Sequence, residues 1–270
     1  MKRMLVLLLA LALCVPAFAQ DGPGTLRIKL FKSGKADAFL LRFGEHAVLI
    51  DTAETDDAED ILEYMAEKEV LKLDLLILTH FDKGHAGGAP EILNTVPVDK
   101  VLMPSYSKDS AAKRALDDAL AGVSAQTQYL DEDLSFQMGG VQFDVNTARE
   151  TYYAEDEDND FSLVTSVRHG QNRFLFTGDI LSQRIEEMMA SGADWRSTLL
   201  QVPDHGRNGS ATEAFLRAAA PAYAVITCSE KNPPAGAVLA LLQQMGVQTY
   251  LTKDGDIALT SDGQAITFKQ

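Results

Sequence analysis

The chain has 270 residues, of which 46% are hydrophobic and 23% are charged, and its formal net charge is −15 at pH 7. This length accommodates one large α/β domain or two small ones, and this composition predicts a packed core. Because polyanions repel so acidic a protein, the charge argues against a generic binder of long nucleic acid.

The first nineteen residues have the composition of a secretory signal peptide. Lys2 and Arg3 precede an apolar run that is too short to span a membrane, and the Ala-Phe-Ala that ends at Ala19 matches a cleavage site. We therefore expect cleavage after Ala19, which leaves a secreted or extracytoplasmic chain without a membrane attachment and with a formal charge of −17 (22 basic against 39 acidic residues). The alternative is a lipoprotein anchored through Cys14, but Leu13 stands where that signal needs a small residue.

Apolar and polar segments alternate along residues 20–270 in a pattern that predicts strands and helices by turns. The predicted strands lie at 25–32, 38–43, 47–51, 73–79, 101–103, 141–147, 162–168, 173–179 and 223–228. The predicted helices begin near residues 55, 89, 108, 180 and 212. Since no linker, repeat or break in composition divides this part of the chain, we expect one layered α/β domain over residues 20–270.

Two further segments carry local signals. Residues 155–160 form an acidic run, which predicts a solvated loop. Residues 249–269 predict two hairpins, one that turns at Gly255 and one that turns at Gly263.

Residues 75–88 carry the strongest chemical signal. An apolar run of strand length is followed by His80, Asp82 and His85, and then by Gly87 and Gly88 ahead of a predicted helix. Imidazole and carboxylate groups are the usual ligands of zinc, iron and manganese in proteins. The spacing therefore indicates a metal site at the edge of a sheet, with chance loop histidines as the alternative.

Three other predicted strands also end in acidic or histidine residues. Asp51 ends the strand at 47–51, Asp179 ends the strand at 173–179, and Asp204 and His205 follow a third at 199–203. Functional groups in layered α/β folds gather where strand ends meet loops, so we expect these side chains to lie near the His80 segment.

These motifs resemble those of the metallo-β-lactamase-fold hydrolases. Residues 80–88, His-Phe-Asp-Lys-Gly-His-Ala-Gly-Gly, resemble the signature His-x-(His/Asp)-x-Asp-His-x-Gly-Gly. The form of this signature with Asp at the third position, as in Asp82, resembles that of the ComEC-like competence branch. The other matching segments are Leu-Ile-Asp-Thr at 49–52, Asn-Asp-Phe-Ser-Leu-Val at 159–164, the strand ending Thr-Gly-Asp at 177–179, Val-Pro-Asp-His-Gly at 202–206 and Leu-Thr-Lys-Asp-Gly at 251–255. The resemblance implies a four-layer αβ/βα sandwich.

The resemblance also implies a set of ligands for one or two divalent metal ions. Zinc is the expected metal, and manganese or iron are the alternatives. The implied ligands are His80, Asp82 and Asn159 at a first site, Asp179 between the two sites, and His85 with Asp204 or His205 at a second site. Two positions depart from the family pattern: Gly84 stands where the family has a liganding Asp, and Asp204 stands where it usually has His.

The resulting functional hypothesis is an exported hydrolase that attacks a phosphoester through metal-activated water, with either one or two intact metal sites. Asp82, Asp179 and His85 would be its catalytic residues, and its substrate would be a small molecule or a short phosphoester. The alternative hypothesis is a catalytically impaired protein of the same fold that serves as a secreted binding or interaction protein, because two altered ligand positions fit a loss of chemistry.

Overall fold

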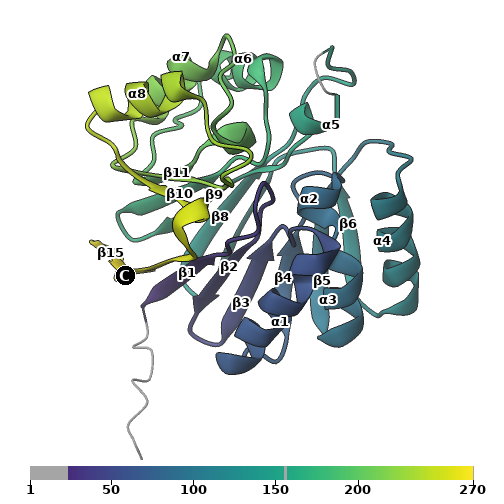
Figure 1. Ribbon diagram of the computed structural model, residues 1–270. Coiled ribbons are helices and arrows are strands. Elements are labelled where there is room, and N and C mark those ends of the chain that lie inside the picture. The colour runs from purple at the N-terminus through teal and green to yellow at the C-terminus, as the bar shows by residue number, and fades with distance from the viewer. Residues whose placement is uncertain (1–23, 155–156, 270) are drawn as a thin grey trace, which may run out of the picture.

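The structure, a computed structural model, describes residues 24–154 and 157–269, so the predicted signal peptide lies outside the described residues. Two mixed β-sheets face each other, and a layer of helices covers the outer side of each sheet (Figure 1). This arrangement confirms the predicted αβ/βα sandwich. Within the described residues, no helix is both long enough and apolar enough to cross a membrane.

The first sheet has eight strands in the order β15-β14-β1-β2-β3-β4-β5-β6. Strands β3 to β6 run parallel to one another, and the remaining neighbours are antiparallel. The strands are β1 Leu26–Leu30, β2 Phe39–Phe43, β3 His46–Ile50, β4 Leu73–Ile77, β5 Val98–Pro104, β6 Gln126–Leu130, β14 Ile257–Ser261 and β15 Ile266–Lys269.

The second sheet has seven strands in the order β13-β12-β11-β10-β9-β8-β7. Strands β10 to β13 are parallel, whereas β7 to β10 are antiparallel. The strands are β7 Leu134–Met138, β8 Val141–Asn146, β9 Val164–His169, β10 Asn172–Phe176, β11 Leu199–Gln201, β12 Tyr223–Ile226 and β13 Gln248–Leu251.

The helices form because their apolar residues recur at helical spacing and face a sheet. In α1, for example, Ile61 and Met65 are both fully buried, and the N-terminus of α4 is capped by Ser110, whose hydroxyl accepts a hydrogen bond from Lys113 N. The helices on the first sheet are α1 Ala58–Glu67, α3 Ala89–Thr95 and α4 Ala111–Gly122; those on the second are α6 Ser182–Ala190, α7 Thr212–Ala219 and α8 Gly236–Gln244 (Figure 1). The short helices are η1 Thr55–Asp57, α2 Lys83–Ala86, α5 Glu157–Asp160, η2 Pro203–Gly206 and η3 Thr252–Asp254.

Three apolar layers stabilise the sandwich. The central layer lies between the sheets and includes Phe39 of β2 and Phe176 of β10, whose ring centroids are 5.2 Å apart. The two outer layers pack helices against the sheets. Since burial of apolar surface is the main favourable term in folding, the central layer fixes how the two sheets, and the loops at their edges, face each other.

The hairpin predicted at Gly255 was wrong. Strand β13 before it pairs in parallel with β12 of the second sheet, and strand β14 after it pairs with β1 of the first. Gly255 turns the chain with a φ of 144°, but the turn carries the chain from one sheet to the other. A turn signal alone does not specify which strands pair. The second hairpin is present, because β14 and β15 are antiparallel neighbours.

The solvated loop predicted for the acidic run was also wrong for its described part. Residues 157–160 form α5, and both Asn159 and Asp160 are buried. The Asp160 carboxylate accepts a hydrogen bond of 2.6 Å from Leu181 N, just ahead of α6. The carboxylate therefore anchors one segment of the second half to another, a role that charge density in the sequence does not reveal.

Candidate metal centre

The site lies where the parallel strands of the two sheets end. Asp51 follows β3 and His80 follows β4, and these strands are parallel neighbours in the first sheet. Asp179 follows β10 and Asp204 follows β11, which are parallel neighbours in the second. The carboxyl ends of parallel neighbours meet at one edge of a sheet, so each sheet delivers two polar loops to the same place.

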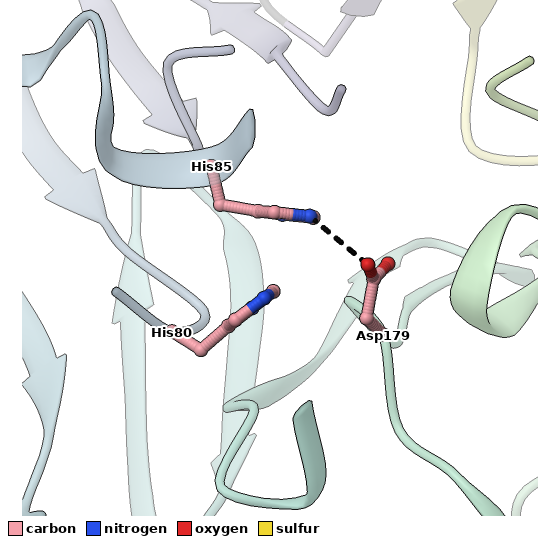
Figure 2. Close-up of side chains that lie close together, drawn as sticks. All are labelled: His80, His85 and Asp179. Atoms are coloured by element: carbon pink, nitrogen blue, oxygen red, sulfur yellow. Dashed lines mark hydrogen bonds and ion pairs between the residues drawn. The ribbon is translucent and has the colours of Figure 1, made fainter. Parts of the chain in front are cut away.

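His80, His85 and Asp179 form the centre of the site (Figure 2). Each is buried, and one ligand atom from each lies within 4.8 Å of the others. The His80 and His85 rings lie 4.0 Å apart between centroids, and both side chains extend towards the Asp179 carboxylate (Figure 2). The structure thus brings together residues that are separated by nearly a hundred positions in the sequence.

The His85 imidazole is held between two carboxylates. Its Nδ1 lies 2.8 Å from Asp51 Oδ2, and its Nε2 lies 3.2 Å from Asp179 Oδ2. Asp51 is itself fixed, because it accepts hydrogen bonds of 2.7 Å from both Thr79 N and Thr79 Oγ1. Burial would lower the pKa of His85, but Asp179 and Asp51 outweigh burial and hold this pKa well above its usual value. A carboxylate at Nδ1 directs Nε2 to a metal.

Asp179 also contacts His205 from the second sheet. Its Oδ2 lies 3.0 Å from His205 Nε2, and His205 Nδ1 lies 2.9 Å from the hydroxyl of Thr227. Burial would raise the pKa of Asp179, but the neighbouring imidazoles of His205 and His85 outweigh it, and the pKa lies well below its usual value. In the structure, this carboxylate is therefore the link between the histidines of the two halves.

His80 and Asp82 form the outer part of the site. His80 Nδ1 lies 3.1 Å from Thr79 Oγ1, and its Nε2 lies 4.0 Å from Asp82 Oδ2. Burial lowers the pKa of His80 to about 3, so its imidazole is neutral and able to bind a metal. The other oxygen of Asp82 receives a hydrogen bond of 2.7 Å from Lys108 Nζ, which also forms an ion pair with Asp158.

Asp204 lies in η2 next to His205, and both residues have positive φ, 45° and 54°. The Asp204 carboxylate is buried and belongs to a compact group with Asp179 and His205. Burial, reinforced by Asp179, raises its pKa to about 6. Arg207 Nε lies 3.2 Å from Asp204 Oδ2 as an ion pair. Both Asp204 and His205 therefore reach the site.

Several buried polar atoms of the site lack a hydrogen-bond partner among the described residues. These atoms are His80 Nε2, Asp179 Oδ1, Asp37 Oδ1 and both carboxylate oxygens of Asp204; the expected ligand Asn159 lies in α5, where its buried Oδ1 also lacks a partner. Leaving a buried polar group unsatisfied costs roughly 1–3 kcal/mol, so such a cluster needs a ligand. Imidazole and carboxylate groups are the ligands that zinc, manganese and iron take in proteins, and the residues therefore fit a divalent cation.

Sequence reasoning missed Asp37 and Lys108. Asp37 is fully buried and lies just before β2, where its Oδ2 accepts a hydrogen bond of 3.1 Å from Gln201 Nε2. The available signal was an aspartate between two alanines, directly ahead of an apolar strand. Lys108 belongs to no recognisable motif, because only the folded chain brings it next to Asp82.

The chain belongs to the metallo-beta-lactamase superfamily, whose family model matches residues 33–229. It is a family of metal-dependent hydrolases, and the homologues of the chain are competence proteins of the ComEC-like branch. The chain is 28% identical over 216 residues to ComE operon protein 3 of Bacillus subtilis (strain 168), and 28% identical over 231 residues to Recombination protein 2 of Haemophilus influenzae.

These alignments cover 77% and 84% of this chain but only 27% of each relative, so the chain spans about a quarter of the length of the curated relatives it matches. Among solved structures, the chain is similar to the metallo-beta-lactamase fold protein YhfI from Bacillus subtilis. The TM-score is 0.57 with 11% identity, over 87% of this chain and 100% of YhfI. At this identity, the likeness supports the fold alone.

Proposed function

We propose that the protein is an exported metal-dependent hydrolase that acts on a small or short phosphoester. The observation that carries this proposal is the buried convergence of His80, His85, Asp179 and His205, with ligand atoms that lack protein partners. Packing alone does not account for such a group, because buried polar atoms without partners destabilise a fold. Zinc is the metal we propose, by the nitrogen-rich donor set.

When bound, the divalent cation supplies Lewis acidity and lowers the pKa of a water molecule that attacks the phosphoester. His80, His85 and His205 would hold the cation together with Asp82, Asn159 and Asp179. Asp51 keeps the His85 ring in one orientation and one tautomer. Asp179 and Asp82 provide the carboxylates that can accept a proton from the attacking water, and His85 completes the catalytic group.

The charges around the entrance favour an anionic substrate. A pocket of about 330 Å³ is lined by Asp204 and His205 of the site and by three basic residues, Lys35, Arg207 and Lys231. Basic side chains gathered at the mouth of an acidic protein focus a positive field where a phosphate would enter. The pocket is small, and the net charge of −15 repels a long polyanion, so we propose a short substrate.

A specific observation also favours the alternative, a catalytically impaired binding protein. Gly84 supplies no ligand, and the Lys108 ammonium already pairs with Asp82. A lysine cation at this carboxylate competes with a metal ion at the first site. In this second proposal, the same pocket binds an anionic ligand without turnover.

Metal content separates the two proposals. Protein purified without a metal-binding tag should contain about one or two equivalents of zinc, manganese or iron by elemental mass spectrometry, and it should hydrolyse bis(4-nitrophenyl) phosphate or its monoester. His80→Ala should lose both properties, whereas His46→Ala, which alters a histidine at the start of β3, should keep them. Protein that takes up no metal from an excess of each ion refutes the hydrolase and supports the binding protein. A metal-loaded protein that cleaves neither ester also refutes the hydrolase proposal and supports the binding-protein proposal.

A further inference from the structure

The position of Gly84 is filled from a different part of the chain. A Cβ atom placed on Gly84 would lie 3.3 Å from Lys35 O and 3.6 Å from Ala36 Cβ. The Gly84 carbonyl accepts a hydrogen bond of 3.0 Å from Asp37 N. The loop at residues 35–37 therefore packs against α2 at the point where the family has a liganding Asp, and it ends in an Asp of its own.

The Asp37 carboxylate faces the histidines of the inner part of the site. It is fully buried, and its Oδ1 lies 3.8 Å from His205 Nδ1. One of its oxygens also lies within 4.8 Å of ligand atoms of both His85 and Asp51. Gln201 satisfies its Oδ2, but its Oδ1 has no hydrogen-bond partner among the described residues.

The buried carboxylates around Asp37 favour a bound cation. Asp37, Asp51 and Asp179 bring three carboxylates into a buried space that they share with the imidazoles of His85 and His205. A buried carboxylate is stable when it is paired or coordinates a metal, and Asp37 Oδ1 accepts no hydrogen bond among the described residues, although His205 Nδ1 lies 3.8 Å from it.

We propose that Asp37 replaces the carboxylate that Gly84 lacks and binds a second metal ion beside the imidazoles of His85 and His205. The inference rests on the proposed metal-dependent function and extends it, because it gives the chain a two-metal centre with one ligand moved to another loop. A two-metal centre can contact both the attacking and the leaving oxygen of a phosphoester.

The test counts metal ions and does not depend on turnover. Metal-free wild-type protein, Asp37→Asn, Asp37→Asn with Gly84→Asp, and the exposed control Asp118→Asn are titrated with Zn²⁺ by calorimetry and with Co²⁺ by visible absorption. We expect two ions in the wild type and in Asp118→Asn. Asp37→Asn should keep one ion and bind the second at least 100-fold more weakly. Adding Gly84→Asp should restore the second ion, since it returns a carboxylate to the family position.

Each outcome decides the inference. Two ions of unchanged affinity in Asp37→Asn, or a single ion in the wild type, overturn the assignment of Asp37 and leave the hydrolase proposal standing. No ion in the wild type overturns both. Weaker binding of both ions to the same degree in Asp37→Asn shows that Asp37 only positions Gln201 and His205, and the ligand assignment then fails. Circular dichroism of the metal-free variants checks that each one is folded.

Discussion

The geometry of the site depends most directly on His85. Asp51 holds its Nδ1 from the first sheet, and Asp179 faces its Nε2 from the second. Asp51 itself has a φ of 56°, a conformation that non-glycine residues seldom adopt, and Thr79 fixes it there through two hydrogen bonds. The strained backbone at Asp51 therefore places its carboxylate where it orients the His85 imidazole.

Removing the charge of Asp51 should weaken metal binding without removing a ligand. In Asp51→Asn, the amide no longer stabilises the His85 tautomer that leaves Nε2 open, and we expect the affinity for Zn²⁺ to fall about 10- to 100-fold. Competition with a chromophoric chelator measures this change. The exposed Asp118→Asn should retain the wild-type affinity, and an unchanged affinity in Asp51→Asn would contradict the positioning role.

Asp204 should reduce the stability of the metal-free protein at neutral pH. Because its folded pKa is raised to about 6 from 3.8, the folded state holds the proton more tightly than the unfolded state does. The stability from this proton is fully present below pH 3.8 and is lost as the pH rises through 6. A shift of this size corresponds to roughly 3 kcal/mol at about pH 8.

With a chelator present, Asp204→Asn should therefore raise the free energy of unfolding at pH 8 by up to that amount. The difference from the wild type should disappear near pH 4. Urea denaturation at the two pH values measures it, with Asp118→Asn as the control. A variant that is less stable than the wild type at pH 8 would show that the Asp204 charge is already compensated, for instance by Arg207.

At the scale of single residues, sequence reasoning found groups that lie in contiguous motifs and missed those that the fold recruits. His80, Asp82 and His85 are within six positions of one another, so their chemistry can be read from spacing. Asp37 and Lys108 reach the site from separate loops, and their neighbours in the sequence carry no ligands. Only the packing of those loops makes them part of the site.

The turn between α2 and α3 sets the position of the whole ligand segment. A Cβ atom on Gly88 would lie 2.3 Å from Thr52 O and 3.2 Å from Ala58 Cβ, so backbone atoms leave no room for a side chain. The same turn is tied to the segment after β3, since Thr52 N donates to His85 O at 2.7 Å. Close backbone contact at Gly88 is thus what brings His85 against Asp51.

Gly88→Ala should therefore disturb both the fold and the site. We expect a loss of about 3 kcal/mol or more of stability, because the clash with Thr52 O is with backbone and has no simple relief. The displaced α2 should also weaken zinc binding. Gly122→Ala, at the end of α4 with no atom within 4 Å of the added Cβ, should be neutral or slightly stabilising. Thermal unfolding of the two variants provides the comparison.

At the scale of elements, strands and helices with strong periodicity were predictable, whereas two features that depend on remote partners were not. The hairpin of β2 and β3 follows from its turn residues and is present in the structure. The chain reversal at Gly255 does not pair its flanking strands, because β12 and β1 offer those strands better partners. Residues 157–160 are helical, and Asp160 is buried with its carboxylate bonded to Leu181 N, a partner that lies 21 positions away.

Across the whole molecule, the ligand groups come from both halves of the sandwich. His80 and His85 lie in the segment that follows β4 of the first sheet, and Asp179 and His205 lie in segments that follow β10 and β11 of the second. A bound ion would thus cross-link two layers that otherwise meet through the apolar core. Any ligand that binds only the folded state stabilises it by mass action.

Metal should accordingly raise the stability of the protein. At a free zinc concentration of about 100 times Kd, the free energy of unfolding should increase by about 2.7 kcal/mol, and excess chelator should reverse the gain. Differential scanning calorimetry with and without chelator measures the effect. His80→Ala, in the first half, and His205→Ala, in the second, should each lose most of this stabilisation by zinc. A thermal midpoint that is insensitive to metal in the wild type would contradict an ion that bridges the halves.

The pairing of β1 with β14 ties the beginning of the described chain to its end. Such contacts between distant segments slow folding, because a long loop must close before they form. The first sheet is also unfinished until β14 has been synthesised, and until then the backbone of β1 presents an open edge that invites pairing with other chains. Ribosomes that stall shortly before β14 would thus release products prone to aggregation, and a chaperone that shields β1 would raise the yield of folded protein.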